Sequence, residues 1–160
     1  FYSDINTDIV INMIDRVSPE GFAEYFSEKI TKNAQFKGKV RFLIDRDNWL
    51  VGHGFMYADR EDFLNFGRYI YSEWEKGGCL GRYLKNAYDN RVRTGKPGDD
   101  YQNYGAFFWF DKPMFKFSHI AMLGHGGHRV IINLDTGAIL SAHAIRRNFS
   151  SYELDKLMTY

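Results

Sequence analysis

The sequence feature that most constrains the fold is Gly-His-Gly-Gly-His at residues 124–128, which stands between two apolar runs. Glycine weakens the interior of a strand, so a glycine cluster typically marks a bulge, a sharp bend, or a place where a ligand or another backbone comes close. Residues 129–134 alternate as a strand does. The sequence therefore predicts a glycine-rich bend beside strands, and its two histidines suggest a ligand as one reason for the bend.

Composition limits the classes of function that this chain can serve. Its 160 residues, 44% of them hydrophobic, suffice for one domain that buries roughly two thirds of its unfolded surface. The 21 basic and 20 acidic residues are scattered and give a net charge of +1, so neither nucleic acid nor an anionic membrane is expected as a partner. No apolar run approaches the roughly 18 residues of a membrane span, so no transmembrane segment is expected.

Residues 1–103 are predicted to be mainly helical. The first helix, capped by Asn6 or Thr7, is indicated by apolar residues on one face of a 3.6-residue period: Ile9, Val10, Met13, Ile14 and Val17. Ser18-Pro19-Glu20 is expected to open a second helix. A third helix is predicted from Asp59 to the glycines at 77–78, and a fourth follows them. Gly67 lies inside the third helix and predicts that this helix packs closely against a neighbour.

Residues 104–160 have the pattern of an antiparallel sheet. Strands are predicted at 104–110, 117–123, 129–134 and 139–145, with a hairpin turn at 135–137 in which Gly137 is left-handed. Short strands are also expected on both sides of a charged turn at 45–48, and residues 93–102 are expected to form an exposed loop. A capping box at Ser150 and Glu153 predicts a final helix. We therefore expect an α/β (α+β) fold, an antiparallel sheet packed by helices, in a single partial domain spanning residues 1–160.

Three interpretations of residues 124–128 follow from the residues themselves. A dinucleotide loop must lead from a strand into a helix, and here a strand follows, so that interpretation fails. A zinc site would combine His125 and His128 with His53, His119 or His143, but strand neighbours point to opposite faces and no carboxylate stands at a useful spacing. No metal or other cofactor is therefore expected, and a structural bend with two hydrogen-bonded histidines stays open.

A resemblance to a known family adds a fourth interpretation. Its pieces occur in order along nearly the whole chain: Tyr2-Ser3-Asp4 and the helix after it, the Phe22-Ala23-Glu24-Tyr25 helix, Gly52-His53-Gly54-Phe55 with the helix from Asp59, the aromatic strand at 104–109, and residues 124–128. Together they resemble the C-terminal half of the serine β-lactamase-related and penicillin-binding-protein-like hydrolases, especially the esterase and 6-aminohexanoate-dimer-hydrolase branch. The resemblance implies the C-terminal part of a β-lactamase/transpeptidase-like fold.

The same resemblance implies roles for particular residues in amide or ester hydrolysis through an acyl-enzyme. Tyr2 would be the proton-transfer phenol of the second motif, and Asp4 would border the substrate where the family has Asn. His125 would replace the third-motif Lys as a hydrogen-bonding or cationic group. Gly126 and Gly127 would leave room for substrate, and the backbone N–H of His128 would be one oxyanion donor.

The main departure from the family is that no Ser-x-x-Lys occurs anywhere in the sequence. The resemblance therefore implies that the nucleophile lies outside these 160 residues. The expected partner is the N-terminal half of the same fold, in a separate chain or another segment, and the expected substrate is a small amide or ester. The core should be apolar on one side where that half is absent. The alternative is a catalytically silent family member that acts as a structural or interaction subunit of a larger assembly.

Overall fold

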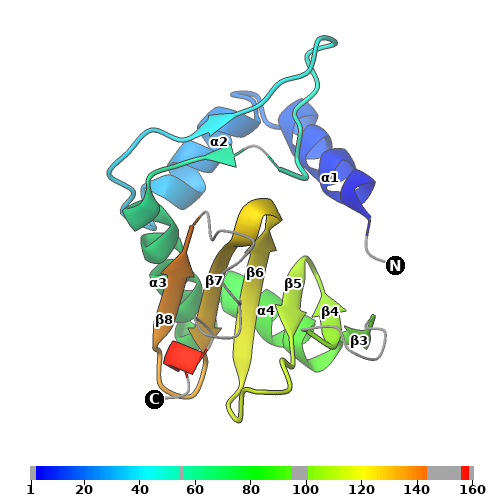
Figure 1. Ribbon diagram of the computed structural model, residues 1–160. Helices are drawn as coiled ribbons and strands as arrows, with labels where there is room; N and C mark the ends of the chain where they lie inside the picture. The colour runs from blue at the N-terminus through cyan, green and yellow to red at the C-terminus, as the bar shows by residue number, and fades with distance from the viewer. Residues whose placement is uncertain (1–2, 55, 95–100, 144–155, 159–160) are drawn as a thin grey trace. The chain divides into compact units, whose positions relative to one another are not determined.

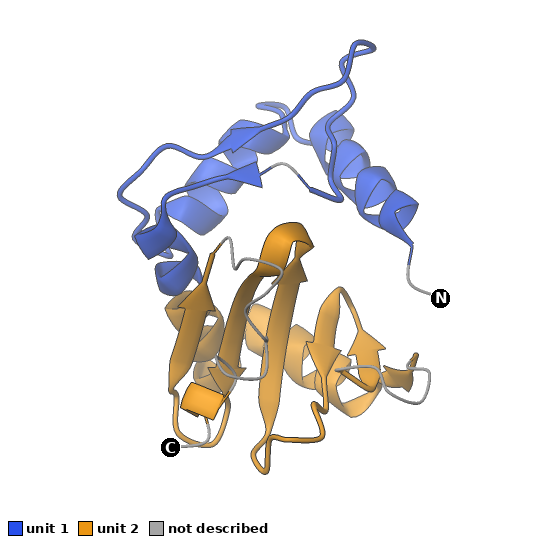
Figure 2. Cartoon of the chain, viewed as in Figure 1, with its two compact units in different colours: residues 1–66 blue, residues 67–160 orange. Residues whose placement is uncertain are grey.

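A computed structural model describes residues 3–54, 56–94, 101–143 and 156–158. The chain divides into two compact units, residues 1–66 and 67–160 (Figure 2). Helices and antiparallel sheets occur together, which confirms the predicted α+β class. Among the described residues no helix has the length and apolar character needed to cross a membrane.

The first unit begins with helix α1 (Asp4–Val17), which confirms the first predicted helix. It starts before Asn6, and the Thr7 hydroxyl donates to the Asp4 carbonyl at 2.6 Å. Helix α2 (Phe22–Phe26) continues into a π-helical turn, η1 (Ser27–Thr31).

The second predicted helix begins later than expected. Residues 18–20 lie outside it, and the backbone at Gly21 is left-handed, with φ at 79°. The Asp15 carboxylate accepts the Phe22 N–H at 2.7 Å, so a side chain of the preceding helix satisfies one of the free N–H groups at the start of α2. The prediction that Ser18-Pro19-Glu20 opens this helix was therefore wrong.

A short ribbon completes the first unit. Strand β1 (Arg41–Phe42) pairs with β2 (Met56–Tyr57), and an isolated bridge joins Ile44 to Leu50 across the predicted turn. The Phe42 ring packs edge-on against two rings of α2, with centroids 5.1 Å from Phe22 and 5.2 Å from Phe26. These three rings fix the ribbon to the helix.

The apolar stripe that predicted α1 is exposed. Four of its members are 42–79% accessible, namely Ile9, Val10, Met13 and Val17, and Ile5 near the start of the helix is 61% accessible. The buried residue of the helix is instead Asn12, at 6% accessible. A contiguous apolar surface of this kind usually marks a place where another surface docks.

The second unit is built on a six-stranded antiparallel sheet in the order β3-β4-β5-β6-β7-β8 (Figure 1). The strands are β3 (Val92–Arg93), β4 (Asn103–Gly105), β5 (Phe108–Phe110), β6 (His119–Gly124), β7 (His128–Asn133) and β8 (Ile139–Ala142). The predicted strand at 104–110 is two strands, because Ala106 and Phe107 have φ of 45° and 71° and reverse the chain between β4 and β5.

The other predicted turn of this sheet is confirmed. Gly137 is left-handed, with φ at 76°, and its N–H donates to the Asn133 carbonyl at 2.9 Å. The predicted capping box at Ser150 and Glu153 and most of the predicted loop at 93–102 lie outside the described residues. A 3-10 turn, η3 (Lys156–Met158), is described near the end of the chain.

Helices α3 (Arg60–Lys76) and α4 (Cys79–Asp89) confirm the third and fourth predicted helices. A Cβ placed on Gly67 would lie 2.9 Å from side-chain carbons of Val130 and Ile139, which confirms the predicted close packing. The Tyr88 ring contacts Trp74 and Phe110 edge-on, so α3, α4 and β5 share an aromatic chain. This packing covers one face of the sheet.

The opposite face of the sheet carries a second core. Its buried members come from several segments: Tyr101, Phe115, Ala121, Ile131 and Met158. In Figure 1, α4 lies behind the sheet and η3 lies in front of it. The central strands are therefore buried on both faces, which makes them a rigid support for the turn between β6 and β7.

The contact between α3 and α4 gives a stability prediction. A Cβ on Gly81 would lie 2.1 Å from the Glu73 carbonyl oxygen, a backbone atom that cannot move aside cheaply. Gly81→Ala gains about 1 kcal/mol of helix propensity, but we expect the clash to reduce the free energy of unfolding by about 1–3 kcal/mol net. Urea denaturation measures this change.

Gly78→Ala is the matched control, since a Cβ there has no described heavy atom within 4 Å. We expect its effect to stay within about 1 kcal/mol. Equal midpoints for the two variants would contradict the close helix contact.

Candidate functional site

The glycine-histidine stretch is a tight turn that closes the β6–β7 hairpin. The ladder runs without a break to the pair Gly124↔His128, so only residues 125–127 stand outside it. Gly126 and Gly127 have φ of 78° and 85°, which L side chains rarely adopt. The glycines are therefore required by the turn itself, whatever else they do.

The His128 ring lies over this turn. A Cβ placed on Gly126 would be 3.9 Å from both Cδ2 and Nε2 of His128. On its other side the ring meets His143, next to β8, at a centroid distance of 5.4 Å and an interplanar angle of 73°. The Ser141 hydroxyl lies 3.3 Å from His143 Nε2. A side-chain cluster thus supports the turn from the neighbouring strands.

His125 differs from His128 in that it belongs to the turn rather than to a strand. It is exposed, as is Gly126 beside it. An exposed imidazole flanked by residues without side chains can approach an oxygen atom of a small molecule, either as a hydrogen-bond partner or, when protonated, as a cation. The turn therefore offers a polar group and open space together.

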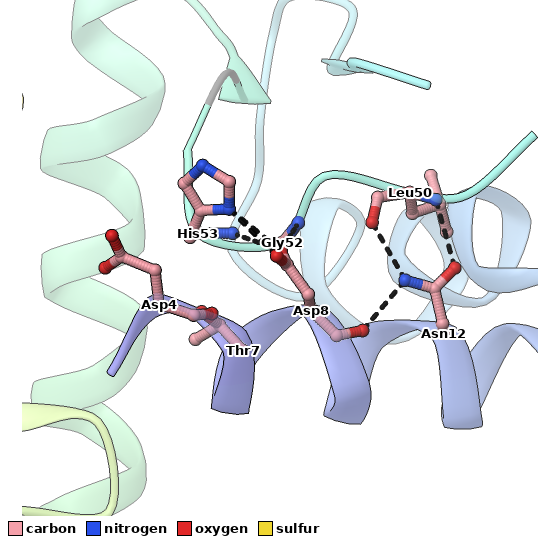
Figure 3. Close-up of polar contacts among 7 residues, drawn as sticks. All are labelled: Asp4, Thr7, Asp8, Asn12, Leu50, Gly52 and His53. Carbon is pink, nitrogen blue, oxygen red and sulfur yellow. Dashed lines mark hydrogen bonds and ion pairs between the residues drawn. The ribbon is translucent and has the colours of Figure 1, made fainter. Parts of the chain in front are cut away.

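The second candidate region lies in the first unit, around the start of α1. Asp4 is exposed and precedes Asp8 by one helical turn. The Asp8 carboxylate accepts the N–H groups of Gly52 and His53 at 2.7 and 3.1 Å, and both of its oxygens lie 3.0 Å from His53 Nδ1 (Figure 3). A carboxylate on Nδ1 orients an imidazole, as in acid–base sites.

Asn12 attaches the same backbone segment one turn further along α1. Its amide nitrogen donates to the Leu50 carbonyl at 2.8 Å, and its amide oxygen accepts the Leu50 N–H at 3.0 Å (Figure 3). The nitrogen also donates to the Asp8 carbonyl at 2.8 Å. The Asn12 amide thus makes with the Leu50 backbone the two hydrogen bonds that a neighbouring strand would make, and it holds residues 50–53 against the helix.

These contacts change the acidity of Asp8. Burial, the largest single cause, raises the pKa of its carboxyl. Several contacts lower this pKa: the hydrogen bond from the His53 ring, the hydrogen bonds from the N–H groups of Gly52 and His53, and the electrostatic attraction of His53. The net result is a pKa below the ordinary value of 3.8. Asp8 is therefore held as a carboxylate.

The structure places the predicted site residues in two groups. His125, Gly126, Gly127 and His128 come together in the one turn of the second unit, whereas Asp4 lies in the first unit. Tyr2 lies outside the described residues. The pairing of Asp8 with His53 was missed, because it joins residues 45 positions apart and no local motif signals it.

The described histidines do not gather around a metal. Among the described residues, no group of three or more His, Cys, Asp or Glu side chains is arranged to hold an ion. His119, one of the zinc ligands considered from the sequence, is 3% accessible and uses both ring nitrogens in contacts with nearby backbone.

Comparison with known proteins does not name a family for this chain. Searches against protein-family models and against curated proteins found no match.

Asn12 provides a test of the first-unit geometry. Asn12→Ala leaves the buried N–H and carbonyl of Leu50 without these partners, at a cost of about 1–3 kcal/mol for each group. We expect the free energy of unfolding to fall by at least about 2 kcal/mol, as measured by urea denaturation.

Asn33→Ala is the matched control, since the exposed Asn33 amide donates only locally, to the Lys29 carbonyl at 2.7 Å. Its change should stay within about 0.5 kcal/mol. An Asn12→Ala variant as stable as this control would show that residues 50–53 do not depend on the Asn12 contacts.

Proposed function

We propose that this chain is the C-terminal portion of a β-lactamase-related serine hydrolase that cleaves a small amide or ester through an acyl-enzyme, with the nucleophile supplied from outside these 160 residues. The proposed fold is the corresponding part of the β-lactamase/transpeptidase-like fold. The observation that carries the proposal is the β6–β7 turn, where residues 124–128, which resemble the family's third motif, expose a histidine beside two left-handed glycines.

In the proposed site the turn borders the substrate. His125 contacts the substrate as a hydrogen-bonding or cationic group, and the glycines at 126 and 127 leave space beside it. The N–H of His128 serves as one donor to the oxyanion that forms when the nucleophile attacks the carbonyl carbon. The sheet, buried on both faces, keeps these groups in place before the substrate arrives.

The second motif supplies proton transfer in this proposal. The Tyr2 phenol moves a proton between the serine, the substrate and the leaving group, and Asp4 stands where the family has an amide. The apolar stripe of α1 directly follows this motif and is exposed. It supports the proposal of a partner, because it provides a surface on which the N-terminal half of the fold can pack.

A catalytically silent subunit is the second candidate function. Two sequence features favour it, the lack of Ser-x-x-Lys and the acidic side chain of Asp4 in place of an amide. In that case the α1 stripe and the turn serve assembly rather than hydrolysis. The two candidates differ in whether any assembly that contains this chain reacts with a serine-directed probe.

Labelling with a fluorophosphonate, followed by mass mapping, tests the proposal. The 160-residue chain alone should not be labelled and should not hydrolyse p-nitrophenyl esters. An assembly with a polypeptide that carries Ser-x-x-Lys should be labelled on that serine. His125→Ala in this assembly should slow acylation by about 10²-fold, because a preorganised polar contact to the substrate is lost.

Lys32→Ala is the control, since it removes only an exposed ion pair with Glu28 at 3.5 Å. Labelling of the isolated chain on one of its own serines would overturn the proposal that the nucleophile lies elsewhere. An assembly that stays unlabelled would favour the silent subunit.

A further inference from the structure

His119, the first residue of β6, is enclosed in the second unit with both ring nitrogens in contact with backbone. Nε2 lies 3.2 Å from the backbone nitrogen of Lys112, and Nδ1 lies 3.2 Å from the carbonyl oxygen of Phe117. An amide N–H can only donate and a carbonyl can only accept. These two contacts therefore require a neutral ring with its hydrogen on Nδ1 and a lone pair on Nε2.

The surroundings of the ring disfavour a second proton. Three aromatic rings enclose it, with centroids 5.0 Å away for Phe115, 5.8 Å for Tyr101 and 5.9 Å for Phe117. Protonation would put a second donor on Nε2, facing the Lys112 N–H. It would also place a charge where little water is present to stabilise it.

The nearby charges do not compensate for this cost. Lys112 is itself buried at 5% accessible, with its ammonium 5.2 Å from the Tyr101 ring centroid. The carboxylate that acts on the site, Asp111, is bound to Arg91 and Asn103. From β7 the residue paired with His119 is the uncharged Asn133. Two cations and one bound carboxylate thus act on the ring.

Residues 111–118 connect β5 to β6, and His119 contacts this connection at Lys112, near its start, and at Phe117, two residues before His119 itself. The segment has other attachments as well: Phe115 N–H donates to the Lys112 carbonyl at 3.0 Å, Ser118 N–H donates to the Asp135 carboxylate at 3.2 Å, and the Ser118 carbonyl accepts the Leu134 N–H at 2.8 Å. The segment also supplies Phe115 to the core cluster. The neutral imidazole adds to these a bond to the Lys112 backbone near the start of the segment.

We propose that His119 is a pH-sensitive latch, which holds residues 112–118 against the sheet while its ring is neutral and releases them when the ring is protonated. Release breaks the Lys112 N–H···Nε2 hydrogen bond and opens the aromatic enclosure at the start of β6. This inference is independent of the proposed hydrolase function.

The direction of the pH dependence follows from the environment of the ring. Burial, the largest cause, lowers the pKa of His119, and the charges of Lys112 and Arg91 lower it further. The hydrogen bond to the Phe117 carbonyl and the charge of Asp111 raise it. The net result is a pKa below the ordinary value of 6.5. A histidine whose folded pKa is depressed binds more protons when unfolded. The latch is thus complete above about pH 6.5 and is lost as the pH falls from there through the folded pKa.

Hydrogen exchange read by mass spectrometry tests the latch on the whole chain at pH 7.5 and 5.0, after correction for intrinsic rates. Peptides that cover 111–119 should lose protection by roughly tenfold or more at pH 5.0. Peptides from α4 should change much less and serve as the internal reference. His119→Gln, which cannot be protonated, should abolish the pH-dependent loss, and His53→Gln should retain it.

Nitrogen NMR of the wild-type ring keeps the test decisive if His119→Gln does not fold. The expected result is a neutral ring with its hydrogen on Nδ1 at pH 7.5 and a midpoint below 6.5 that coincides with the loss of protection. An ordinary midpoint near 6.5 with residues 111–119 still protected would overturn the latch, as would acid release that persists in a folded His119→Gln variant.

Discussion

The pairing of β6 with β7 is the interaction on which the rest of the second unit depends. It forms an unbroken ladder of six residue pairs, from His119↔Asn133 to Gly124↔His128. Ile120, Ile131 and Ile132 within it are fully buried, each worth about 1.5–3 kcal/mol relative to an exposed side chain. A one-residue slip of this register would exchange the two faces and place both cores wrongly.

The register also determines what stands at each end of the hairpin. At one end the chain must reverse within three residues, which requires the left-handed glycines at 126 and 127 and leaves His125 exposed. At the other end His119 faces the second core and meets the segment that enters β6. A solvent-facing imidazole and an enclosed one thus lie at opposite ends of one strand pair.

Features set by local chemistry could be predicted from the sequence, and features set by distant contacts could not. The turn at Gly137 and the helix end at Gly77 each need a left-handed residue, and glycine signals both. The reversal at Ala106 and Phe107 carries no such signal, because neither residue favours that backbone conformation. The Asp8–His53 contact depends on which loop meets α1, and the sequence of neither segment specifies its partner.

Helix α1 shows a different limit of periodicity as evidence. Its apolar spacing correctly predicted a helix, but the same spacing usually indicates the buried face, and here the buried contacts are polar. Asn12 and Asp8 attach the helix to residues 50–53 through directional hydrogen bonds. Because these bonds hold the helix, its apolar stripe stays exposed and can pack against another surface. A helix held in place by its apolar stripe would have that stripe buried.

The environments of Asp8 and His119 imply that their contacts are lost to acid in a definite order. Asp8 has a lowered pKa, so its contribution to stability is complete above about pH 3.8 and is lost only as the pH falls through its folded pKa. His119 also has a lowered pKa, but the ring is a base, so its contribution begins to fall near pH 6.5. The difference arises because Asp8 is most stable charged, beside its donors, whereas His119 is most stable neutral, among aromatic rings. Mild acid therefore weakens the attachment of residues 112–118 in the second unit while the Asp8 contacts of the first unit persist.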